Sequence, residues 1–176
     1  GTVGTGTLVG GTLQNDQLVS IEPGGHSARV RMIQTAGNTV EQIGAGNRVA
    51  VNLAGVDHTD VKRGDAVIEP GRWRLTERFD ASLRVLDALD HDVSRRGAYV
   101  AYIGAGEHAV KLRVLGVQEL GPGTTGAVRL FLPAALPLLP GDRFVLRESG
   151  RDETVGGGEV LDIDPVLRAS RAAPDR

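Results

Sequence analysis

The 25 glycines of this 176-residue chain are spread along it, between short runs of β-branched and other apolar residues. Residues 28–33 largely alternate apolar and basic side chains, as a half-buried strand does. Between such runs stand turn signals: Gly10-Gly11, Gly24-Gly25, Gly37-Asn38 and Arg63-Gly64-Asp65. Short strands separated by glycine turns, without long helical stretches, predict an all-β fold whose sheets close into barrels and so lose their exposed edges.

The strand pattern is interrupted once near the middle, at Glu69-Pro70-Gly71. Proline has no N–H to give to a β-ladder, so a domain boundary is expected there. We predict two tandem small β-barrels, over residues 1–70 and 71–165. Trp73 should be partly buried close to the boundary, because its large ring needs cover. Residues 166–176 hold too little apolar surface to pack and are expected to form a linker or disordered tail.

The second half contains five further stretches of strand length. Between the first two, three aspartates at positions 87, 90 and 92 would disturb a strand, so residues 86–94 are expected to form a short helix or a turn. The expected strands cover residues 78–86, 98–103, 110–114, 127–132 and 143–147.

Composition excludes several classes of function. Cysteine is absent, which removes disulfides, cysteine-zinc sites and thiol nucleophiles. No apolar run approaches the roughly 20 residues that cross a bilayer, so we expect no membrane partner and a cytoplasmic location. The net charge of -2 means that any contact with nucleic acid must be local. The chain opens at Gly1, within an expected strand, and is interpreted as a fragment.

No catalytic motif is present. The sequence contains no G-x-x-x-x-G-K-[ST] phosphate loop, and Gly4-Thr5-Gly6 and Gly104-Ala105-Gly106 are expected to be barrel turns because neither opens a helix. The four histidines lack the spacing of a helical metal site. We therefore predict no catalytic residues, no metal site and no cofactor in this chain.

Several segments together carry a family resemblance. They are Gly1-Thr2-Val3, residues 5–8, residues 30–34, residues 45–53, Arg63-Gly64-Asp65, residues 140–147 and residues 154–162. In order and spacing they are similar to the second and third domains of translational GTPases of the elongation factor Tu superfamily. The triple glycine at 156–158, followed by Val160-Leu161-Asp162, most resembles the selenocysteine-specific branch.

The resemblance implies that the first barrel receives the aminoacylated 3′ end of tRNA. Gly44, Ala45, Gly46 and Asn47 would let backbone approach the terminal adenosine, because small residues leave room. Arg48 would be the anchor, since a guanidinium stays charged and can hold an ester oxygen, a phosphate or a selenolate. Alternatively, Arg48 covers the barrel rim without a ligand. An acidic and basic pair that completes the family's pocket would lie before Gly1.

The resemblance also implies that the second barrel meets the tRNA stem. Arg143, Arg147 and Arg151 recur every four residues around a strand end and would contact stem phosphates, with Arg151 the favoured contact. The alternative is a solvated basic edge paired with Glu148, Asp152 and Glu153.

The function expected from the resemblance is delivery of selenocysteinyl-tRNA to the ribosome in a GTP-dependent cycle. GTP, Mg²⁺ and hydrolysis would belong to a GTPase domain outside this chain, and C-terminal RNA-binding domains would be further partners. Two alternatives remain open. One is the arm of another translational GTPase, contacting ribosome or protein rather than charged tRNA. The other is a small β-barrel enzyme, against which stands the lack of any nucleophile and base pattern.

Overall fold

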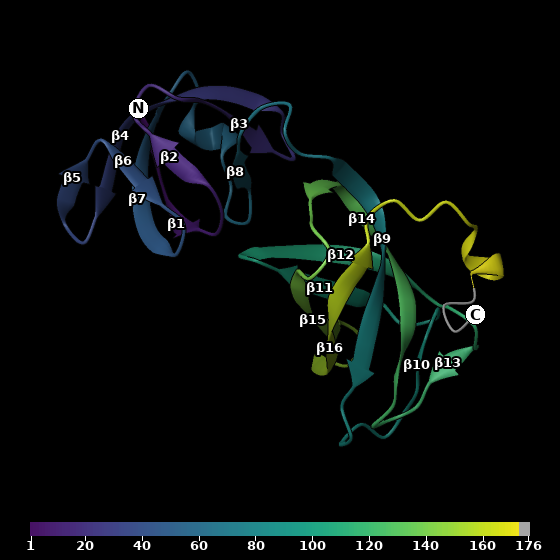
Figure 1. The fold of residues 1–176 in the computed structure, drawn as a ribbon. Coiled ribbons are helices and arrows are strands. Elements are labelled where there is room, and N and C mark those ends of the chain that lie inside the picture. The colour runs from purple at the N-terminus through teal and green to yellow at the C-terminus, as the bar shows by residue number, and fades with distance from the viewer. Residues whose placement is uncertain (173–176) are drawn as a thin grey trace. The chain divides into compact units, whose positions relative to one another are not determined.

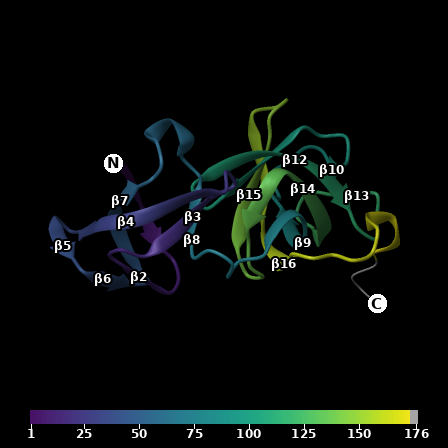
Figure 2. The same ribbon diagram turned by 90° about the horizontal axis from the view of Figure 1, so that it is seen from above.

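The computed structural model describes residues 1–172 and divides the chain into two compact units, Gly1–Trp73 and Arg74–Arg176. Each unit has its own hydrophobic core, and the cores share no residue. Figure 1 shows the strands of both units, and Figure 2 shows the same ribbon from above. Trp73, the last residue of the first unit, is half-buried. The division falls three residues after the expected boundary.

The first unit is built from eight strands and one 3-10 turn. Their bounds are β1 (Thr2–Leu8), β2 (Thr12–Gln14), β3 (Leu18–Glu22), β4 (His26–Thr35), β5 (Asn38–Val40), β6 (Gln42–Gly44), β7 (Asn47–Ala54), η1 (His58–Asp60) and β8 (Ala66–Ile68). The main sheet has the order β1-β7-β4-β3-β8, with β5 paired to β4, and β2 pairs β6 separately. Buried and exposed residues alternate along β7, where Val49, Val51 and Leu53 enter the core. This alternation is why a glycine-rich segment with few aromatic residues still forms a packed sheet.

The second unit contains the other eight strands. Their bounds are β9 (Leu75–Val85), β10 (Val93–Ser94), β11 (Tyr99–Ile103), β12 (Gly106–Val114), β13 (Glu119–Leu120), β14 (Thr125–Pro137), β15 (Arg143–Glu148) and β16 (Glu153–Asp162), followed by a 3-10 turn, η2 (Ala169–Arg171). Six of them close a barrel in the order β11-β12-β14-β9-β16-β15. Phe79 and Phe144 meet edge to face inside it, with ring centroids 6.0 Å apart.

The predicted all-β class with two barrel-type units is confirmed, and hydrogen bonding adds a distinction between them. The second unit is a closed barrel, whereas the main sheet of the first is an open half-barrel with β1 and β8 at its ends. Residues 86–94 form turns and the short strand β10, so the turn alternative holds there. Within residues 1–172, no helix is long and apolar enough to cross a membrane.

The segment expected to be a tail is joined to the second barrel at its start. The backbone oxygen of Leu167 accepts a hydrogen bond from the guanidinium of Arg129, a residue buried on β14. The 3-10 turn η2 follows. The rest of the expected tail, residues 173–176, lies outside the described residues.

Candidate nucleic-acid interface

The turn between β6 and β7 is held by hydrogen bonds to the backbone at Leu8 and Gly11. Gly46 has a φ of 86°, in the left-handed region that glycine adopts readily. The Ala45 N–H donates to the oxygen of Gly11 (3.1 Å), and the Gly46 N–H donates to the oxygen of Leu8 (2.8 Å). The Asn47 side chain donates to the oxygen of Gly44 (3.0 Å). Two of the turn's amides are therefore already used, and the turn would offer a ligand its open space and side chains rather than these N–H groups.

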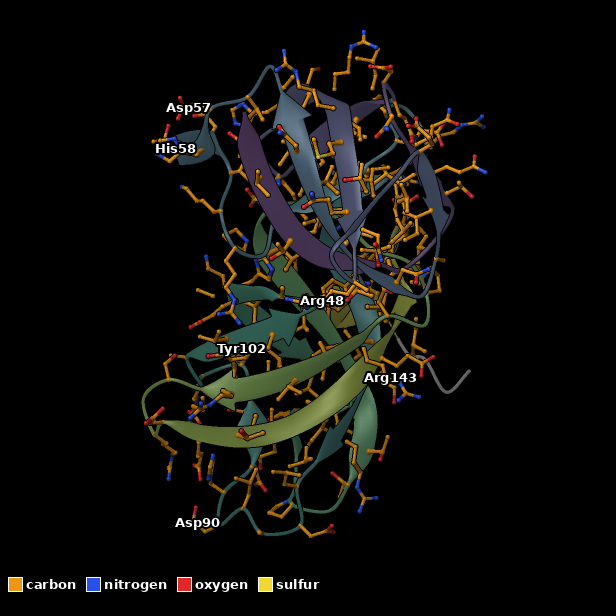
Figure 3. All side chains as sticks on the ribbon, turned by 90° about the vertical axis from the view of Figure 1, so that its left-hand side faces the viewer. Arg48, Asp57, His58, Asp90, Tyr102 and Arg143 are labelled. Carbon is orange, nitrogen blue, oxygen red and sulfur yellow. The ribbon has the colours of Figure 1, made fainter. Side chains whose placement is uncertain are left out.

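Arg48 stands directly after this turn, on β7, with an exposed side chain (Figure 3). Its backbone oxygen accepts a hydrogen bond from the Thr35 hydroxyl (3.0 Å), which fixes the strand beneath it. Among residues 1–172, no hydrogen bond or ion pair engages its guanidinium. The structure thus places Gly44, Ala45, Gly46, Asn47 and Arg48 together on one exposed turn with a free cation. A free guanidinium can take an anionic or ester group of a ligand.

The three arginines expected on the second unit lie along β15 and in the turn that follows it. Arg143 begins β15 and Arg147 lies four residues along it, which separates their Cα atoms by about 13 Å. Arg147 donates to Asp152, at 2.8 Å to the carboxylate and 2.9 Å to the backbone oxygen. Arg151 lies 3.7 Å from the carboxylate of Asp90 and 3.9 Å from that of Glu148. Two of the three cations are therefore paired with acids nearby.

Arg143 differs from the other two. It is exposed, and no ion pair involving it occurs in the described part of the chain. The neighbouring Asp142 accepts from the backbone N–H of Leu139 instead (2.8 Å). Arg143, labelled in Figure 3, is consequently the one member of the expected set whose charge is not already opposed.

A second group of cations, which the sequence analysis missed, converges on a hollow of the second unit. The hollow has a volume of about 530 Å³ and is lined by Arg95, Arg96, Lys111, Arg113 and Phe131, together with Leu112. A larger hollow shares Arg95, Arg96 and Arg113 and continues to Glu119, Ala169 and Ser170. We call the surface formed by Arg95, Arg96, Lys111, Arg113 and Phe131 the basic groove.

The elements explain why these side chains meet. Arg95 and Arg96 follow β10, whereas Lys111 and Arg113 stand two residues apart on β12 and therefore share its outer face. Phe131 on β14 lies opposite Lys111 in the ladder. No ion pair engages the four cations within residues 1–172. Four positive charges gathered this closely favour the approach of an anion. The sequence signals were the Arg95-Arg96 pair and the alternation of Lys111 with Arg113.

Comparisons with known proteins agree with this architecture. Residues 80–166 match the family described as selenocysteine-specific elongation factor, beta-barrel domain. The chain is 32% identical to the selenocysteine-specific elongation factor of Desulfomicrobium baculatum over 171 residues, which covers 97% of this chain and 27% of the relative. It is also 32% identical to elongation factor Tu 2 of Streptomyces avermitilis, covering 93% of this chain and 43% of the relative.

A solved structure shows the same fold. The crystal structure of the bacterial selenocysteine-specific elongation factor EF-Sec superposes with a TM-score of 0.77 at 26% identity, over 94% of this chain and 26% of that protein. The chain thus spans about a quarter of the length of the selenocysteine-specific factors that it matches. Sequence, fold and coverage lead to one conclusion: the chain belongs to the selenocysteine-specific elongation factor family, within the elongation factor Tu superfamily, and corresponds to two β-barrel domains of that family.

Proposed function

We propose that this chain is the aminoacyl-tRNA-binding part of a selenocysteine-specific elongation factor. The observation that carries the proposal is the basic groove, where four cations that form no ion pair with any described residue line one hollow of the second barrel. Phosphate contacts of this kind position a nucleic acid and read little of its sequence. The groove would therefore hold the backbone of a tRNA stem, whatever its base sequence.

In the first unit, the free guanidinium of Arg48 would face the aminoacyl end of the tRNA. Selenocysteine is deprotonated at neutral pH and serine is not, so a cation near the aminoacyl group favours the selenocysteinyl form. A guanidinium suits this role because it remains charged and donates in a fixed fork. The turn amides of Ala45 and Gly46 are committed to Gly11 and Leu8, so they would support the pocket rather than bind the ligand.

GTP hydrolysis is assigned to a different domain. The 176 residues contain no phosphate loop, so no residue here would hold GTP or Mg²⁺. Delivery of the charged tRNA to the ribosome would depend on that GTPase domain, and messenger recognition on further RNA-binding domains. The two barrels would bind the tRNA.

The salt dependence of RNA binding tests the proposal. Each phosphate that a cation neutralises contributes roughly -0.9 to the slope of log K against log salt on B-DNA, a value that serves as a guide for a tRNA stem. Replacing Arg96 or Arg113 by Ala should reduce the slope by about one unit and weaken binding of every tRNA alike. Binding can be measured by fluorescence anisotropy with labelled tRNA from about 50 to 200 mM salt.

Arg147→Ala is the matched control, because this half-buried arginine is already paired with Asp152. It should leave the slope nearly unchanged, and Arg151→Ala should have a smaller effect than Arg113→Ala. Arg143→Ala tests for a second contact on β15, since Arg143 forms no ion pair within the described part of the chain. If Arg147→Ala changes the slope as much as Arg113→Ala does, the basic groove is not the stem-binding surface.

A further inference from the structure

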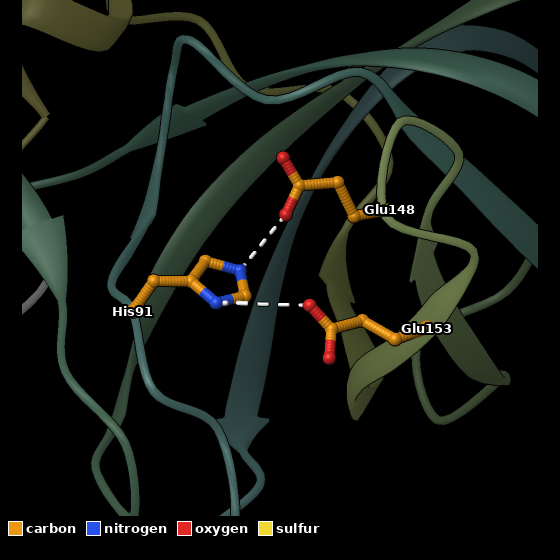
Figure 4. A group of neighbouring side chains, drawn as sticks. All are labelled: His91, Glu148 and Glu153. Atoms are coloured by element: carbon orange, nitrogen blue, oxygen red, sulfur yellow. Dashed lines mark hydrogen bonds and ion pairs between the residues drawn. The ribbon is translucent and has the colours of Figure 1, made fainter.

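His91 joins two parts of the second barrel that are far apart in sequence. It lies in the turn segment between β9 and β10, and its side chain is 16% exposed. Its Nε2 is 2.9 Å from a carboxylate oxygen of Glu148 on β15. Its Nδ1 is 3.0 Å from Asp90 and 3.7 Å from Glu153 on β16. Figure 4 shows the ring between the two glutamates.

The charges around the ring favour an imidazolium. Three carboxylates face it, and the nearby cation among residues 1–172 is Arg151, 3.7 Å from Asp90 and 3.9 Å from Glu148. Tyr99, on β11, is the other titratable group at this place, and its hydroxyl is bonded to Ser94. A protonated ring donates from both nitrogens, whereas a neutral ring has one N–H and must turn a lone pair toward a carboxylate. Protonation therefore satisfies both sides of the ring at once.

A metal ion fits the same atoms less well. Glu148 lies at Nε2 and Glu153 lies at Nδ1, the two nitrogens that flank Cε1. One nitrogen of His91 and one oxygen of each glutamate lie within 4.8 Å of one another, and an ion held at about 2.0–2.1 Å would have to draw these atoms together from their hydrogen-bonded positions. On the Nδ1 side, the Arg151 guanidinium already lies against Asp90. The geometry thus suits a proton shared among acids better than a coordinated ion.

We propose that His91 is a proton-controlled latch, which fastens the segment between β9 and β10 to the β15–β16 hairpin and steadies the adjoining Arg95 and Arg96. Hydrogen bonds that do not involve His91 hold the two ends of this segment. The Leu86 N–H donates to Val155, and the Tyr99 hydroxyl donates to the oxygen of Ser94. Between these ends, Leu89 packs against the core and Asp90 pairs with Arg151, and His91 contacts both β15 and β16. The functional importance of steadying Arg95 and Arg96 rests on the proposed RNA-binding role. The latch itself does not rest on that role.

The direction of the pH effect follows from the contacts. Hydrogen bonds to Asp90 and then to Glu148 raise the pKa of His91, against the opposing effects of burial and of Arg151. A pKa that is higher in the folded state contributes stability that is complete below the unfolded value, near 6.5. That contribution is lost as the pH rises through the folded pKa. The latch is therefore closed in mild acid and open in mild base.

Amide hydrogen exchange and histidine NMR test the latch in this chain. In the wild type, the protection factors of the hydrogen-bonded amides of Leu86 and Leu89 should fall between pH 6 and pH 8.5, tenfold for each unit by which folding raises the pKa of His91. In His91→Gln, protection should be low at both pH values. The NMR titration of His91 in the wild type needs no variant and should give a midpoint above 6.5. A midpoint at or below 6.5 overturns the proposal.

His58→Gln is the matched control. His58 also lies beside an aspartate, with its Nδ1 3.1 Å from Asp57, but its side chain is 82% exposed and belongs to the first unit. This variant should keep the wild-type pH response of the Leu86 and Leu89 amides. If one equivalent of Zn²⁺ shifts the His91 resonances, the ring binds a metal ion in place of the proton. That outcome overturns the latch. A pH-dependent latch without any change in tRNA affinity would overturn only the link to Arg95 and Arg96.

Discussion

The guanidinium of Arg129 is almost fully withdrawn from water, with 3% of its side chain exposed. It lies against the Asp80 carboxylate, with Nε and Nη2 donating at 2.6 Å and 2.9 Å. Its Nη1 donates to Leu167, so the same side chain joins β14, β9 and the segment after β16. A buried charge of this kind is tolerated because each nitrogen finds an acceptor.

Arg129→Ala should strongly destabilise the second barrel. Breaking a buried ion pair by removing one partner costs about 3–5 kcal/mol, because the other charge remains uncompensated. The free energy of unfolding can be measured by urea denaturation of wild type and variant. Arg147→Ala, which removes an exposed pair with Asp152, should cost less than about 1 kcal/mol. Equal losses in the two variants would show that Asp80 does not depend on Arg129.

Arg48→Ala should weaken binding of selenocysteinyl-tRNA more than binding of seryl-tRNA. A hydrogen bond to a charged group is worth about 1.5–3 kcal/mol, or roughly 10- to 100-fold in affinity. The measurement uses the full factor with GTP, to which the proposed function assigns tRNA binding. Arg31→Ala, an exposed arginine on β4, is the control and should affect both tRNAs little. Equal losses for both tRNAs from Arg48→Ala would assign the guanidinium to a phosphate or to a structural role.

At the scale of the element, the three glycines of β16 explain how this strand fits between its neighbours. A Cβ added at Gly156 would collide with the backbone oxygen of Arg84, and one at Gly158 with the backbone oxygen of Ser82 and the ring of Phe144. At Gly157 the nearest atom would be the Phe144 oxygen, 3.3 Å away. Two of the three positions therefore require the absence of a side chain.

These contacts predict different costs along one short run. Gly156→Ala and Gly158→Ala should each destabilise the second barrel by about 1–3 kcal/mol, the usual cost of overpacking. Gly157→Ala should cost less, because a shift of a few tenths of an ångström relieves the contact. Thermal unfolding of the three variants measures the difference. The explanation fails if Gly157→Ala is the most destabilised of the three.

The strands could be predicted from sequence because their signal is local. Alternation in residues 28–33 and the turn at Arg63-Gly64-Asp65 needed no knowledge of the partner strands, and β4 and β8 are found there. The pairing of Arg147 with Asp152 was foreseen as an alternative, since the two are close in sequence. Convergence of Arg95 with Lys111 could not be foreseen, because it depends on which strands the barrel brings together.

At the scale of the whole molecule, the two units differ in how their sheets end. The second barrel has a core of 20 buried residues around a closed ring of strands, and the first has a core of nine under an open sheet. A complete ring with its own core should be stable alone.

A chain consisting of residues 74–176 should therefore fold by itself. We expect it to give the same amide NMR shifts for β9 to β16 as the longer chain, apart from residues near the cut. Residues 1–73 should be less stable, because fewer buried side chains offset the entropy of ordering the backbone. Circular dichroism melts of both pieces provide the comparison. A molten second unit would show that its ring depends on the first.

The open sheet of the first unit has a further consequence. Strands β1 and β8 each have a single neighbour in the main sheet, so each leaves a row of backbone donors and acceptors without a ladder partner. Such rows recruit strands from other molecules. Val3 on β1 and Val67 on β8 are 62% and 43% exposed, so both edge strands also present apolar surface. Isolated first units should thus polymerise through the edge strands β1 and β8 on heating, whereas isolated second units should unfold without forming fibrils.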